Sequence, residues 1–74
     1  MHSADPVGTR LVELGRAMRN HGLTVGTSEV ADAAAATSAL GLADRERLRS
    51  GLAATMMRRS ADRMVFDQLF DIYF

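Results

Sequence analysis

The chain has 74 residues, no cysteine, and nine arginines balanced by nine acidic residues, so its formal net charge is zero. The missing cysteines exclude a disulfide framework and a zinc cluster of the cysteine type. The balanced charge argues against a dedicated binder of nucleic acids or anionic membranes, which normally shows a basic excess. No apolar run is long enough to span a membrane, and no apolar signal segment opens the chain, so we expect a cytoplasmic protein.

The apolar share of 47% is that of a globular domain, and a chain this short has room for one small core. Hydrophobic periodicity predicts an all-α fold, a small bundle of four helices at about 6–21, 27–40, 44–58 and 61–74. We expect residues 1–5 to form a flexible N-terminal tail and residues 6–74 to form a single helical domain.

The 6–21 helix has Pro6 at its first position, and Asp5 precedes it as a candidate N-cap. Gly22 follows the helix and is a typical stop signal. Apolar side chains recur at helical spacing and predict one narrow buried stripe. The stripe consists of Val7, Leu11, Leu14 and Met18.

The 27–40 helix is capped by Gly26, Thr27 or Ser28, and Gly41 ends it. Glu29 lies in the first turn, where the helix dipole favours a carboxylate. Its apolar stripe is made of small side chains, so a neighbouring helix can approach closely. The members are Val30, Ala33, Ala34, Thr37 and Leu40.

The 44–58 helix begins after Asp44, which is a good N-cap. Leu48, Leu52 and Met56 form its predicted buried line. Gly51 lies inside the helix, where glycine costs about 1 kcal/mol relative to alanine. We therefore expect close helix packing at Gly51.

The 61–74 helix, with Ser60 as its expected cap, carries an apolar arc broader than one neighbouring helix normally needs. Asp67, Gln68 and Asp71 hold the narrow polar side. We therefore expect the helix to be central in the bundle or to contact a partner, and a further domain to follow Phe74, because no stop signal ends the helix. The arc comprises Val65, Phe66, Leu69, Phe70, Ile72, Tyr73 and Phe74.

The sequence predicts no catalytic residue, no cofactor-binding residue and no metal ligand. His2 and His21 have no acidic or cysteine partner at ligand spacing. The serines lie at helix caps or within helices, not on the strained turn that a nucleophile needs. The glycines form no phosphate-binding loop.

Two kinds of binding surface can be considered, one for DNA and one for a protein partner. The second and third helices can be drawn as a helix-turn-helix, but acidic residues alternate with the arginines there, which favours a solvated face over a DNA-binding one. Two methionines fall on predicted polar faces, close to a pair of arginines, and unburied methionine is frequent at binding surfaces. The candidate partner contacts are Met57, Arg58, Arg59, Met64 and Phe74.

Four segments in one register resemble the CoxE-like family of VWA-domain proteins. Residues 16–25 are similar to the family pattern R-x-L-R-x-x-G-L-x-V, and residues 29–33 to E-V-x-D-A. Residues 41–45 and 52–56 resemble x-L-x-D-R and L-R-A-T-L, and residues 62–74 resemble D-x-x-x-F-D-x-x-F-D-x-Y-F. The resemblance covers nearly the whole chain, with Met18 where leucine is usual and Gly26 where serine or proline often stands.

The resemblance implies an N-terminal helical region that precedes a VWA domain, or a short open reading frame that matches one. It implies a non-catalytic docking or assembly module that acts with a VWA domain, in cis or in trans, and with a MoxR-type AAA+ ATPase in metalloenzyme maturation or complex assembly. The D-x-S-x-S metal motif of the VWA domain does not occur in this chain. The alternative is a stand-alone small helical protein with a DNA-binding or regulatory function.

Overall fold

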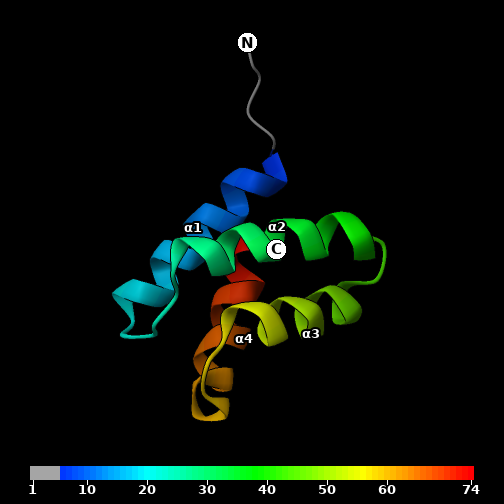
Figure 1. Ribbon diagram of the computed structural model, residues 1–74. Coiled ribbons are helices and arrows are strands. Elements are labelled where there is room, and N and C mark those ends of the chain that lie inside the picture. Colours follow the sequence, from blue (N-terminus) through cyan, green and yellow to red (C-terminus); the bar gives the residue numbers. More distant parts are fainter. Residues whose placement is uncertain (1–5) are drawn as a thin grey trace.

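The computed structural model describes residues 6–74, which form four α-helices and no strand (Figure 1). The helices are α1 (Pro6–Asn20), α2 (Thr27–Leu40), α3 (Arg45–Met56) and α4 (Arg63–Tyr73), with a short 3₁₀ helix, η1 (Ser60–Asp62), before α4. This confirms the predicted all-α bundle of four helices. The predicted tail at residues 1–5, with the Asp5 cap, lies outside the described residues.

Two helix pairs build the bundle. α2 and α3 are joined by a short turn and run antiparallel, side by side, while α1 packs against α4 and α2 (Figure 1). α3 and α4 approach each other less extensively, so side chains contribute much of the connection between them. Among the described helices, none combines the length and the hydropathy that crossing a membrane requires.

One hydrophobic core lies between the helices. The predicted stripes of α1 and α3 are its centre, and α4 adds its aromatic side chains, as the sequence predicted. The predicted stripe of α2 is buried only in part: Ala33 and Thr37 are buried, Val30 and Leu40 are half-buried, and Ala34 is exposed. The Thr37 hydroxyl donates to the Ala33 carbonyl at 2.8 Å. The largest fully buried side chains are Leu11, Leu14, Met18, Leu52, Met56, Phe66 and Phe70.

Helix ends follow local signals. The Asp44 carboxylate accepts hydrogen bonds from the backbone N–H groups of Glu46 and Arg47, both at 3.1 Å, which confirms the predicted cap of α3. Gly22 has a φ of 88°, and the N–H of Leu23 donates to the Met18 carbonyl at 2.9 Å. This is the glycine-terminated hydrogen-bond pattern that typically ends a helix.

Small residues let the helices approach closely. A Cβ atom on Gly51 would collide with Leu40 Cδ1 of α2, which confirms the close packing predicted there. A Cβ atom on Gly15 would lie 3.0 Å from Val30 Cγ2, so α1 also passes close to α2. The glycines therefore allow α2 to lie against both neighbouring helices.

The segment between α3 and α4 differs from the prediction. α3 ends at Met56, two residues earlier than expected, and Met57 has an extended backbone. Ser60 opens the 3₁₀ turn η1 and does not cap α4, which begins at Arg63. The bend lets Phe66 and Phe70 enter the core, a tertiary requirement that local capping signals do not contain.

Candidate interaction surfaces

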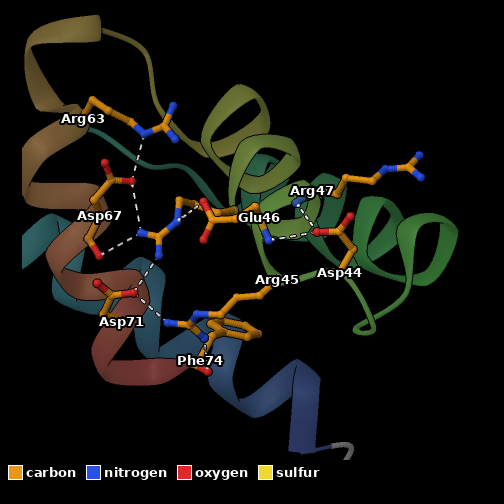
Figure 2. A network of polar contacts seen from close by, with 9 residues as sticks. Asp44, Arg45, Glu46, Arg47, Arg63, Asp67, Asp71 and Phe74 are labelled. Carbon is orange, nitrogen blue, oxygen red and sulfur yellow. Dashed lines mark hydrogen bonds and ion pairs between the residues drawn. The ribbon is translucent and has the colours of Figure 1, made fainter.

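An ion-pair network joins α3 to α4, and Arg49 lies at its centre. Its guanidinium group contacts Asp71 Oδ1 at 2.8 Å, Glu46 Oε1 at 3.3 Å and Asp67 Oδ1 at 3.4 Å. Arg45 reaches Asp71 Oδ1 at 2.6 Å, so two arginines one helical turn apart share this carboxylate (Figure 2). The network holds α4 against α3 through polar groups at the edge of the core.

Arginine 63 extends the network along α4. Its Nε lies 2.9 Å from Asp67 Oδ1, one helical turn further along. Figure 2 shows Arg63 and Asp67 on the same side of α4 as Asp71, so the polar face of this helix is turned toward α3. Two of the three residues on the predicted polar side of α4, Asp67 and Asp71, therefore make contacts within the domain.

The ring of Phe70 lies beneath the network. The guanidinium carbons of Arg45 and Arg49 each lie 4.8 Å from its centroid, within the range of a cation–π interaction. The ring of Phe74 stacks on Phe70 with centroids 5.1 Å apart, and the Phe74 carbonyl accepts a hydrogen bond from Arg45. The end of α4 is thus held by both aromatic and charged groups.

These contacts shift the pKa values of the groups involved. Hydrogen bonds from Arg49 and Arg45 lower the pKa of Asp71, and those from Arg63 and Arg49 lower the pKa of Asp67. The hydrogen bond to Asp71 raises the pKa of Arg49 above its ordinary value. Both carboxylates are therefore charged at neutral pH.

A separate hollow of about 270 Å³ opens at the junction between α3 and α4. Its apolar lining consists of Ala53, Ala54 and Met57. Its polar lining residues are two serines and three arginines, Ser50, Ser60, Arg58, Arg59 and Arg63. We call it the junction hollow.

The three arginines of the junction hollow make few contacts within the domain. Arg58 Nη2 pairs with Glu29 Oε2 at 3.1 Å, and Arg59 Nε lies 3.7 Å from the Asp62 carboxylate. The side chains of Arg58, Arg59 and Arg63 are 57%, 76% and 43% exposed. Each guanidinium group thus keeps donors that face solvent.

The structure brings together three of the five predicted partner contacts. Met57, Arg58 and Arg59 line the junction hollow. Met64 is 74% exposed, as expected, at the start of α4. Phe74 lies at the other end of α4, about 15 Å further along the helix axis, and is half-buried against the core. A role for these residues in binding stays a prediction.

Met57 is more buried than its position on a predicted polar face suggested. It packs against the core. The cause is the early end of α3, because the extended backbone at Met57, with φ −89° and ψ 144°, turns its side chain away from the face that a continued helix would give it.

Sequence reasoning missed Arg63 in the hollow and Arg49 in the network. The spacing did contain a signal, since Arg45 and Arg49 stand four residues apart on α3, as Asp67 and Asp71 do on α4. Two such pairs of opposite charge fit two facing helices. Only the fold shows that these helices are neighbours.

The remaining candidate residues for metal or DNA binding are histidines, acidic residues and arginines. Within residues 6–74 there is no group of three His, Cys, Asp or Glu residues that could hold a metal ion. His21 Nδ1 lies 2.9 Å from the Ala17 carbonyl at the end of α1, and His2 lies outside the described residues. Of the arginines considered for DNA binding, Arg45, Arg49, Arg58 and Arg59 are ion-paired, while Arg47 makes no ion pair within the described chain.

Comparison with models of protein families found a match over most of the chain. The family model described as the CoxE N-terminal helical bundle domain matches residues 11–74. The chain belongs to this family. The matched range covers α2, η1, α3 and α4 completely and most of α1. Neither the curated proteins nor the solved structures yielded a match.

Membership in the CoxE N-terminal family confirms the resemblance seen in the sequence. The family description names a helical bundle, and four helices in residues 6–74 form one. The junction hollow and the ion-pair network of this CoxE N-terminal domain both lie inside the matched range.

Proposed function

We propose that this domain is a non-catalytic docking module of a CoxE-like protein. In this proposal it acts in the cytoplasm, with a VWA domain in cis or in trans and with a MoxR-type AAA+ ATPase, in metalloenzyme maturation or complex assembly. Membership in the CoxE N-terminal family supports the context. The junction hollow is the observation that carries the docking role.

The composition of the hollow supports docking over catalysis. Methionine and arginine are enriched at protein interfaces, and arginine is among the residues that most often dominate binding energy. Here Met57 lies next to three arginines whose side chains are all more than two-fifths exposed. The ion-pair network beside the hollow connects α3 to α4, so little ordering is needed when a partner binds.

A binding experiment tests this function. The purified chain is titrated with the VWA domain of a CoxE-like protein and with a MoxR-type ATPase from the same organism, and heat of binding is measured. We expect one of the two to bind, and Arg59→Ala to weaken the complex about threefold, the usual size for an exposed charge. Arg47→Ala is the matched control, because Arg47 is an exposed arginine of α3 outside the hollow.

The same experiment separates docking from the DNA-binding alternative. Binding to neither protein would contradict the proposed function. Salt-sensitive binding to duplex DNA, with equal losses for Arg47→Ala and Arg59→Ala, would favour the small DNA-binding regulator instead. Equal losses are the expected result there because phosphate contacts are spread over many arginines.

A further inference from the structure

The charge of the junction hollow is one-sided, although the domain as a whole is neutral. Its lining in the described chain holds three arginines and no acidic residue. The carboxylates that touch these arginines, on Glu29, Asp62 and Asp67, belong to residues outside the lining. A ligand in the hollow therefore meets basic residues from the segment between α3 and η1 and from the start of α4.

The arginines are available for a second contact. A guanidinium group has five N–H donors in a planar fork, which fits a carboxylate with two parallel hydrogen bonds. Arg59 is 76% exposed, and its one ion pair within the described chain spans 3.7 Å, near the upper limit of such a contact. Arg58 engages Glu29 through only one nitrogen.

The apolar lining of the hollow indicates that its ligand also carries an apolar group. Met57, Ala53 and Ala54 contribute only carbon and sulfur side-chain atoms to the hollow. A methionine side chain adapts its shape to varied apolar partners, and the two alanines leave space beside it. A volume of about 270 Å³ accommodates one or two side chains rather than a whole helix.

We propose that the junction hollow binds an acidic peptide segment of a protein partner, in which one apolar side chain stands between carboxylates. The apolar side chain contacts Met57, and the carboxylates pair with Arg58, Arg59 and Arg63. The proposal rests on the docking function proposed above and specifies the chemistry of the partner at that site.

A protein segment fits this site better than nucleic acid. Each of the three arginines already pairs with one carboxylate, on Glu29, Asp62 or Asp67, so the site is not the uninterrupted basic surface that the phosphate backbone of a nucleic acid requires. Single-stranded nucleic acid also needs aromatic side chains for its bases to stack on, and the lining of the hollow contains none. Phe66 and Phe70 are fully buried elsewhere.

The test uses the full chain with ¹³C-methyl-labelled methionine and a short blocked peptide in which one phenylalanine stands between glutamates. We expect the Met57 methyl signal to shift on titration, while Met18 and Met56 stay unchanged because they are fully buried in the core. A peptide with glutamine in place of glutamate should bind at least about tenfold more weakly, since charge-assisted hydrogen bonds are lost.

Charge reversal provides the matched comparison. Arg59→Glu should weaken peptide binding at least about tenfold, because like charges then face each other. Arg47→Glu introduces the same change outside the hollow and should leave the affinity within about twofold. Circular dichroism of both variants establishes that the helices are retained.

Several results would overturn the proposal. They are no shift of the Met57 signal at any peptide concentration, equal losses for the two variants, or binding of duplex DNA in preference to the acidic peptide. Failure of the acidic-peptide proposal can be distinguished from failure of the proposed docking function. Peptide binding without any complex with the VWA domain or the ATPase would refute those partners alone. A complex that Arg59→Ala weakens, from a chain that does not bind the acidic peptide, would refute only the acidic segment.

Discussion

Arg49 is surrounded by the carboxylates of Glu46, Asp67 and Asp71 and by the ring of Phe70. Its side chain is only 13% exposed, which is rare for an arginine and tolerable because several carboxylates share the charge. Two of its nitrogens reach two different residues of α4. The planar shape of the guanidinium group therefore matters as much as its charge.

Arg49→Lys tests this geometry. A lysine keeps the positive charge but presents one ammonium group in place of the fork, so it cannot hold Asp67 and Asp71 together while lying over Phe70. We expect the free energy of unfolding to fall by about 1 kcal/mol, a value reduced for the partial exposure of both carboxylates. Urea unfolding followed by circular dichroism measures the change. Arg47→Lys should leave stability unaltered, and an equal effect of the two variants would contradict the role given to Arg49.

At the scale of the helices, an ion-pair network joins α3 to α4 in addition to the hydrophobic core that both helices share. α4 directs Phe66, Leu69 and Phe70 into the core and its polar side toward α3. Ile72 of the predicted apolar arc is 70% exposed, so part of this arc is not covered within the domain, and Met64, which lies outside the arc, is 74% exposed.

Acid should loosen the connection between α3 and α4. The pKa values of Asp67 and Asp71 are lower in the folded domain than in the unfolded chain, where an aspartate has a pKa of about 3.9. The unfolded state therefore takes up protons first as the pH falls below about 4. The stability that these ion pairs contribute is present above that pH and is lost as the pH falls through the folded-state values.

Asp71→Asn should reduce this pH dependence, because it removes one of the two shifted carboxylates. We expect the thermal midpoint of the variant to be lower than that of the wild type at neutral pH and to fall by fewer degrees on acidification. Asp32→Asn changes an exposed aspartate without an ion pair in the described chain and serves as the control. Parallel curves for wild type and Asp71→Asn would argue against the network as the source of acid sensitivity.

At the scale of the whole molecule, one core without disulfides stabilises the domain. A chain of this length has a free energy of unfolding of about 4–11 kcal/mol. Leu52 is fully buried on α3, in the same core cluster as Phe66 and Phe70 of α4. A cavity at this position removes contacts from a small core and so lowers a free energy of unfolding that is already small.

Leu52→Ala should therefore lower the free energy of unfolding by about 2–5 kcal/mol, a large share of the total. Leu42→Ala removes the same atoms from a side chain that is 50% exposed in the turn between α2 and α3, and should cost much less. Equilibrium unfolding in urea compares the two. Similar losses for both variants would mean that the core does not lie where these helices place it.

The sequence by itself determined the helices and their buried sides. Asp44, Gly22 and Gly41 act through hydrogen bonds and backbone conformations within a few residues, so local rules predict the helix ends they control. Leu48, Leu52 and Met56 follow the helical period, which identifies a buried line without knowledge of its neighbours. The family pattern is visible in the sequence for the same reason, because it consists of these regularly spaced positions.

The tertiary structure decided everything that depends on which helices meet. The 3₁₀ turn at Ser60–Asp62, the burial of Met57 and the joining of Arg45 and Arg49 to Asp71 link residues whose contacts no local rule contains. Arg63 joined the junction hollow only because the chain bends between α3 and α4. Helical period and capping are short-range properties, whereas a binding surface is made by side chains that packing brings together from separate elements.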